Sequence, residues 1–183
     1  MRQFNFIKNN MATEGTDFIY SKLLEQKPRL NLGCNSDIRD TYINIDILDT
    51  IEGVDIVADV KNLLFIQKES VEEILAYDLL EHFPFSETTA ILKNWISKLK
   101  KDGKIIVRVP DLEKISKKVV DGTLPIFEAQ RLIYGGQDYE FNFHFAGFTS
   151  GMLEGLLLAS GCTSIVQIVR ENDSHNVTIV AKK

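Results

Sequence analysis

Polar residues recur where short apolar runs end in the first half of the chain. Gly33 ends RLNLG, and Asp46 and Asp59 fall at the ends of YINID and VDIVAD. Asp78 directly follows EILAY. A glycine turn lets backbone amides approach a ligand, and a strand-end carboxylate can accept hydrogen bonds from both ribose hydroxyls. Each residue alone also fits an ordinary loop, but four strand ends on one sheet edge together indicate a nucleoside-type ligand site.

The same residues do not fit the dinucleotide-binding pattern GxGxxG. That pattern requires glycine where this chain has Asn35 and Ile38. Thirteen residues separate Gly33 from Asp46, against about 20 in the pattern. The helix between these two strands must therefore be short or missing, and a dinucleotide-dependent oxidoreductase is only a second alternative for the function.

The runs that carry these residues are short and apolar, as is typical of buried parallel strands. We predict seven strands, which cover 29–33, 42–47, 54–60, 73–77, 104–109, 163–170 and 176–182. The turn between the last two is too short for a crossover helix, so this pair must be antiparallel. The alternation of strand and helix patterns indicates an α/β fold, with a largely parallel sheet that ends in an antiparallel hairpin.

Helical periodicity marks several of the segments that lie outside the predicted strands. Ser86 is expected to cap a helix that ends before Gly103, and Thr149 or Ser150 one that ends at Gly161. Other helices are predicted over 17–26, 112–120 and 126–134. We expect residues 1–27 to form a helical lead and 28–183 one domain. Within it, 111–148 forms a lid or insertion over the carboxyl edge of the sheet, where ligands bind in open α/β sheets.

Composition excludes several classes of function. The chain has 183 residues, 26% of them charged, and a net charge of −5, which argues against a nucleic-acid or membrane-surface binder. No apolar run approaches the ~20 residues that span a bilayer, and no signal peptide is visible. Cys34 and Cys162 have neither CxxC spacing nor a nearby His to complete a zinc set, so we expect reduced thiols, no metal ion and a soluble cytoplasmic protein.

In chain order, LNLGCN, NID, VADV, YDLLEHF and LKKDGKIIVRVPDLE resemble the class I S-adenosylmethionine-dependent methyltransferases. The nearest group is the short bacterial and archaeal one that often accompanies glycosyltransferases. GGQDYEFNFHFAGFT and LLLASG resemble its C-terminal part, so the resemblance covers roughly 29–183. It implies a Rossmann-like seven-stranded sheet in the order 3-2-1-4-5-7-6 with an antiparallel last strand, and S-adenosylmethionine as the cofactor.

The resemblance also implies roles for individual residues. Gly33 and its neighbours would lie against the methionine part of the cofactor, Asp46 would bind the ribose hydroxyls and Asp59 the adenine amino group. The expected cofactor-binding set comprises strand-end residues, namely Leu32, Gly33, Cys34, Asn35, Asp46, Ile47, Asp59, Val60, Tyr77 and Asp78. The second glycine of the family is Asn35 here, which tolerates a left-handed backbone but narrows the approach to the cofactor.

Two histidines are candidates for a catalytic base. His144 lies in the aromatic segment FNFHF over the presumed mouth of the site, and His82 follows the fourth strand. Either could instead hold a loop by hydrogen bonds. The predicted function is in-line methyl transfer to a small-molecule or saccharide-type acceptor, with oxygen as one candidate atom. A non-catalytic module that binds S-adenosylmethionine or its demethylated product is the alternative, and nothing in the sequence supports a homo-oligomer.

Overall fold

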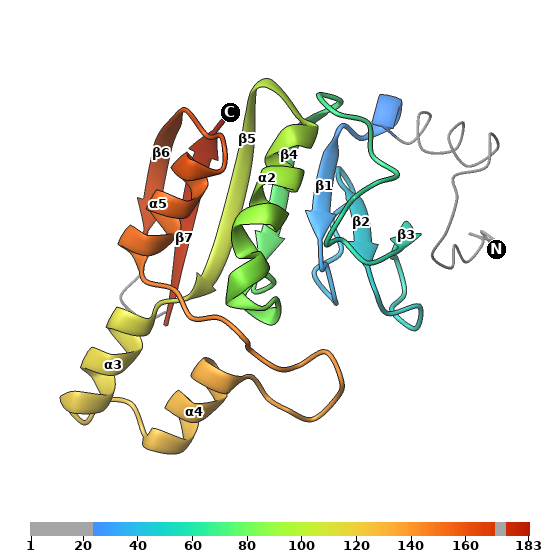
Figure 1. Ribbon diagram of the computed structural model, residues 1–183. Coiled ribbons are helices and arrows are strands. Elements are labelled where there is room, and N and C mark those ends of the chain that lie inside the picture. The colour runs from blue at the N-terminus through green and yellow to red at the C-terminus, as the bar shows by residue number, and fades with distance from the viewer. Residues whose placement is uncertain (1–23, 171–174) are drawn as a thin grey trace.

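A single seven-stranded sheet forms the centre of the molecule. The structure is a computed structural model that describes residues 24–170 and 175–183. The strand order is β3-β2-β1-β4-β5-β7-β6 (Figure 1). The strands are β1 Arg29–Leu32, β2 Ile43–Asp46, β3 Ile56–Val57, β4 Val71–Tyr77, β5 Leu99–Pro110, β6 Ser164–Val169 and β7 Asn176–Lys182. The pairs from β3 to β5 are parallel, whereas β7 is antiparallel to both β5 and β6, which confirms the predicted topology.

The main core lies between this sheet and two helices. The helices α2, Thr88–Lys98, and α5, Ser150–Ala159, run side by side over one face of the sheet (Figure 1). Trp95 is fully buried there, and its Nε1 donates to the backbone oxygen of Val60 at 2.8 Å. This bond ties the helix to the loop after β3. Within the described residues, no helix is long and apolar enough to cross a membrane.

Several predicted boundaries differ from the structure. Ser86 does not cap α2, because residues Phe85–Glu87 form a 3-10 turn and the helix begins at Thr88 without a side-chain cap. Thr149 does cap α5, since its side chain accepts a hydrogen bond from the amide of Met152. The predicted helix over 17–26 lies outside the described residues except for its last turn, 24–26, which is helical.

Among the strands, β3 and β5 differ most from their predicted lengths. β3 has only two residues, so Asp59 lies in the loop beyond it rather than at its end. β5 begins five residues early, because Leu99 pairs with Val71 before the register shifts. Asp102, at φ 65, lies in this irregular stretch, and Gly103 is therefore inside β5 instead of following the helix.

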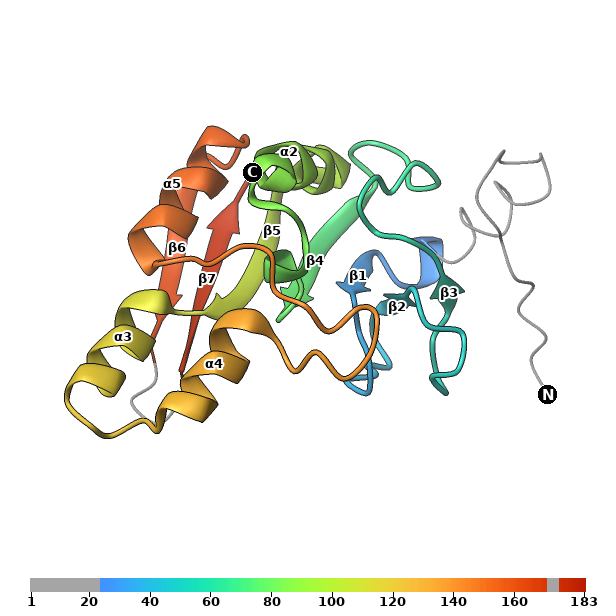
Figure 2. The same cartoon turned by 60° about the horizontal axis from the view of Figure 1, so that its bottom comes forward.

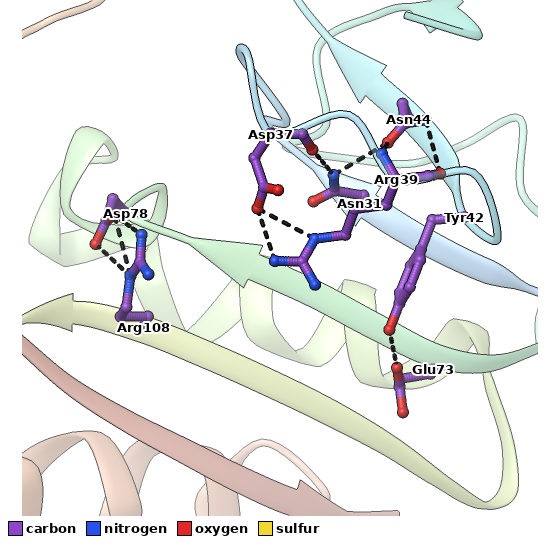
Figure 3. Close-up of polar contacts among 8 residues, drawn as sticks. All are labelled: Asn31, Asp37, Arg39, Tyr42, Asn44, Glu73, Asp78 and Arg108. Atoms are coloured by element: carbon purple, nitrogen blue, oxygen red, sulfur yellow. Dashed lines mark hydrogen bonds and ion pairs between the residues drawn. The ribbon is translucent and has the colours of Figure 1, made fainter. Parts of the chain in front are cut away.

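No helix connects β1 to β2, as the thirteen-residue spacing predicts. Two buried amides, Asn31 and Asn44, are register partners in these strands and hold the connecting loop (Figure 3). Asn31 Nδ2 donates to Asn44 Oδ1 at 3.1 Å and to the backbone oxygen of Asp37 at 2.6 Å. The side chain of Asn44 accepts a hydrogen bond from the backbone amide of Arg39 and donates one to the backbone carbonyl of the same residue. The loop is thus fixed by side-chain amides in place of a helix.

Replacement of Asn44 by alanine is expected to lower the free energy of unfolding by about 2–3 kcal/mol, because buried polar partners lose their hydrogen bonds. Urea denaturation at pH 7 measures this change. The matched control is Gln167→Ala, since Gln167 is exposed on β6 and its loss should change stability by less than about 0.5 kcal/mol. Equal stabilities of the two variants would contradict the role given to Asn44.

Candidate functional site

A cavity of about 390 Å³ opens at the carboxyl edge of the sheet. This volume falls within the range of small-molecule sites, which is about 300–1,000 Å³. Of the predicted cofactor-binding residues, only Leu32 does not line it, because its side chain is fully buried in the core. The cavity is lined by the nine others: Gly33, Cys34, Asn35, Asp46, Ile47, Asp59, Val60, Tyr77 and Asp78.

Asp46, the last residue of β2, is oriented by the two loops beside it. Its side chain is only 6% exposed. Oδ2 accepts a hydrogen bond from the amide of Asn35 at 2.8 Å, and Oδ1 accepts one from the amide of Leu48 at 3.0 Å. A carboxylate offers about four acceptor positions, so about two remain for hydroxyl groups of a ligand in the cavity.

The turn after β1 adopts the backbone shape that a close approach requires. Gly33 has φ 59 and Asn35 has φ 42, both in the left-handed region. A Cβ atom at position 33 would lie 2.6 Å from Leu79 Cδ1. Glycine at this position therefore leaves room for the Leu79 side chain, which also lines the cavity. Asn35 thus takes the left-handed conformation that asparagine tolerates, and its amide is the one that binds Asp46.

Asp59 reaches the cavity from the loop after β3. One of its carboxylate oxygens, Oδ1, accepts a hydrogen bond from the amide of Lys61 at 2.8 Å, which fixes the side chain. The remaining acceptor positions of this carboxylate can accept hydrogen bonds from a donor such as an amino group. Asp46 and Asp59 therefore place two carboxylates on the wall formed by the end of β2 and the loop after β3.

A charged pair forms the opposite wall. Arg108 of β5 donates hydrogen bonds to the carboxylate of Asp78 from Nε, at 3.1 Å, and from Nη2 (Figure 3). Asn176 donates to the same carboxylate at 3.1 Å. Asp78 has φ 49, a conformation that costs a non-glycine residue about 1–2 kcal/mol, and these contacts offset the strain. The guanidinium also lies 4.2 Å from the ring centroid of Tyr77.

The 111–148 segment supplies the remaining wall. It contains α3, Leu112–Val120, and α4, Ile126–Tyr134, and its loop extends from α4 toward the ends of β1 and β4 (Figure 2). The loop is anchored to the 3-10 turn η1, Leu80–His82, because the amides of Phe145 and Ala146 both donate to the carbonyl of Glu81. It contributes four residues to the cavity: Tyr139, Glu140, Phe141 and Phe145.

The two candidate histidines occupy different positions. His82 lines the cavity, and its Nδ1 donates to the backbone oxygen of Phe143 at 3.0 Å. His144 is not among the lining residues; its Nδ1 donates to the backbone oxygen of Leu132 at 3.0 Å, and its ring contacts that of His82 edge to face. Burial lowers the pKa of both imidazoles, so both are neutral at pH 7.

A buried acid that the sequence analysis did not select lies beside these histidines. Glu81 is 1% exposed, and neither of its carboxylate oxygens receives a hydrogen bond from another described residue. Burial raises the pKa of the Glu81 carboxyl well above its usual range, and the charge of Asp78 adds to this effect. One carboxylate oxygen of Glu81, one ring nitrogen of His82 and one ring nitrogen of His144 lie within 4.8 Å of one another.

Arg108 was also missed, although the sequence contains a signal for it. It is the one charged residue among the apolar residues of IIVRV, where a buried strand would otherwise be uniformly apolar. The aromatic residues of the cavity have no such signal. Their position depends on the fold of the 111–148 loop, which periodicity does not predict.

No family model matches the sequence, and no curated protein matches it either. Solved structures do match. A methyltransferase from Thermotoga maritima, described as S-adenosylmethionine-dependent and a possible histamine N-methyltransferase, has a TM-score of 0.62 and 16% identity, covering 92% of this chain and 87% of that one. An S-adenosylmethionine-dependent methyltransferase from Mesorhizobium loti has a TM-score of 0.61 and 10% identity, covering 92% and 98%. One from Archaeoglobus fulgidus has a TM-score of 0.57 and 15% identity, covering 92% of each.

The chain has the class I S-adenosylmethionine-dependent methyltransferase fold. The methyltransferase fold accounts for the strand order, the antiparallel β7 and the cavity at the carboxyl edge. It is shared at low sequence identity, so the neighbours establish architecture, and the chemistry is argued from the residues of the cavity.

Both cysteines are expected to be unreactive in the folded protein. Burial and the charge of Asp46 raise the pKa of the Cys34 thiol to about 12, and burial raises that of Cys162 to about 11. At pH 8 only about one Cys34 in ten thousand is a thiolate, the form that reacts. Ellman's reagent should therefore react slowly with the native protein and rapidly in guanidinium chloride. A rapid phase equal to one thiol per native chain would contradict this assignment.

Proposed function

We propose that the chain is a methyltransferase that uses S-adenosylmethionine and acts on a small-molecule or saccharide-type acceptor. The observation that carries the proposal is the carboxylate of Asp46. It is buried at the end of β2, held by the amides of Asn35 and Leu48, and still has acceptor positions toward the cavity. This arrangement suits the two hydroxyls of a ribose.

The other residues of the cavity fit the remaining parts of the cofactor. The left-handed turn at Gly33 leaves room for the methionine part against the backbone. Asp59 offers an acceptor for the adenine amino group, and Tyr77 and Asp78 line the wall where the sulfonium would lie. When bound, the cofactor supplies an electrophilic methyl group. The protein then needs mainly to hold the acceptor in line with that methyl group and exclude water.

The acceptor would bind between the charged wall and the loop after α4. Phe141 and Phe145 present aromatic surface, and the Asp78–Arg108 pair presents polar groups. Aromatic rings beside polar groups suit a sugar or another small polyol, which supports oxygen as the acceptor atom. His82 rather than His144 is the imidazole that meets this acceptor, because only His82 lines the cavity.

Replacement of Asp46 by alanine is expected to weaken S-adenosylmethionine binding by about 10–100-fold, since a charge-assisted hydrogen bond contributes about 1.5–3 kcal/mol. Asp46→Asn keeps an acceptor oxygen without the charge and should fall between alanine and wild type. Isothermal titration calorimetry measures the affinities, and thermal unfolding verifies that each variant is folded. The matched control is Asp40→Ala, because Asp40 is an exposed carboxylate outside the cavity wall. Wild-type affinity in Asp46→Ala would refute the assignment.

The wild-type protein is expected to bind S-adenosylmethionine and its demethylated product and not to bind NAD, which separates methyl transfer from the oxidoreductase alternative. Incubation of S-adenosylmethionine with a panel of sugars, phenols and amines, followed by mass spectrometry, tests turnover directly. Formation of the demethylated product with one acceptor class would establish the enzyme. Saturable binding without turnover on any acceptor would favour the regulatory binding module instead.

A further inference from the structure

We propose that Glu81, His82 and His144 form a binding site for a divalent transition-metal ion of the zinc type. Two imidazoles and one carboxylate are a known ligand set for such ions, and three protein ligands leave a position open for water or substrate. Each of the three residues offers one ligand atom, and these three atoms lie within 4.8 Å of one another. Two ligands on a tetrahedral zinc ion are about 3–3.5 Å apart, so small side-chain rotations close the site.

The hydrogen bonds of both imidazoles prepare them as ligands. A backbone carbonyl only accepts hydrogen bonds, so Nδ1 of His82 must donate to Phe143 and Nδ1 of His144 must donate to Leu132. Each neutral ring therefore carries its lone pair on Nε2. Metal-ligating histidines regularly donate their second ring nitrogen in this way, which fixes the tautomer and the ring orientation.

The carboxylate of Glu81 lacks the partner that its burial requires. It is 1% exposed, and no other described residue donates a hydrogen bond to either oxygen. A buried carboxylate is costly unless it is paired or binds a metal. The adjacent cation cannot pair with it, because Arg108 is engaged by Asp78. Burial favours the neutral acid in the absence of a partner, and a metal ion between Glu81 and the two histidines would replace that proton and pair with the carboxylate.

The ion would lie at the margin of the cavity, since His82 belongs to the cavity wall. Its open position would face the acceptor, and a hydroxyl oxygen is a suitable fourth ligand. This role deepens the proposed function and rests on it, whereas the metal site itself rests only on the three side chains. With Nε2 bound to the ion, neither histidine would serve as the base, and His82 would contact the acceptor site as a ligand of the ion.

Metal content and affinity test the site without reference to activity. Wild-type protein, loaded with Zn²⁺ and dialysed, is expected to retain one ion per chain by atomic emission. Glu81→Gln and His144→Ala are expected to bind Zn²⁺ at least about 100-fold more weakly in calorimetric titrations, because each loses a ligand. The matched control, His175→Ala, removes a histidine outside the cluster and should bind as wild type does. Loss of bound Zn²⁺ from wild type on dialysis, or equal affinity in all variants, would overturn the proposal.

Cobalt provides a measurement on the wild type alone, should a variant unfold. Co²⁺ bound by nitrogen and oxygen ligands should give weak visible bands without the strong near-ultraviolet band of a cobalt–thiolate bond. A thiolate band would place the ion on Cys34 or Cys162 and overturn the assignment.

Chelation of the metal ion is expected to lower the rate of methyl transfer while the affinity for the cofactor stays constant. Metal binding without cofactor binding would refute only the proposed function, and cofactor binding without metal binding would refute only the metal site.

Discussion

The hydrogen bond between the buried amides of Asn31 and Asn44 is the constraint on which the cavity depends. Most doubly wound sheets cross from one parallel strand to the next through a helix, because a parallel pair cannot be closed by a tight turn. Here the connection from β1 to β2 contains no helix. The paired amides instead bind the backbone at Asp37 and Arg39 and hold this loop against the sheet (Figure 3).

The position of Asp46 follows from this arrangement. Its carboxylate accepts a hydrogen bond from the amide of Asn35, which lies in the loop that the two asparagines hold. The left-handed backbone at Gly33 and Asn35 directs that amide toward β2. Thus the Asp46 carboxylate, which we propose binds the ribose, is positioned by backbone amides, and a charge-assisted hydrogen bond of this kind is stronger than a neutral one. A longer loop with a helix would need other contacts to reach the same geometry.

The sequence predicted these strand ends because their signals are local. Apolar runs ended by Gly33, Asp46 and Asp78 identify the edge of the sheet, and the short spacing predicts the missing helix. Helix capping was predicted where a side chain makes the bond, as at Thr149, and was wrong at Ser86, where a 3-10 turn displaces the start of the helix. The lengths of β3 and β5 depend on pairing with β2 and β4, which periodicity within one run does not contain.

The Glu81 cluster could not be predicted for a different reason. Glu81 and His82 are adjacent, but His144 is more than sixty residues away, and no spacing rule joins them. They meet because the loop after α4 returns to η1, where the carbonyl of Glu81 accepts two of its amides. Within that loop, a Cβ atom at Gly135 would lie 2.4 Å from the carbonyl oxygen of Asn142, so only glycine lets these two parts of the loop approach each other so closely. In the proposed function Phe141 and Phe145 of this loop contact the methyl acceptor, so the two hydrogen bonds at the carbonyl of Glu81 also position the proposed acceptor site.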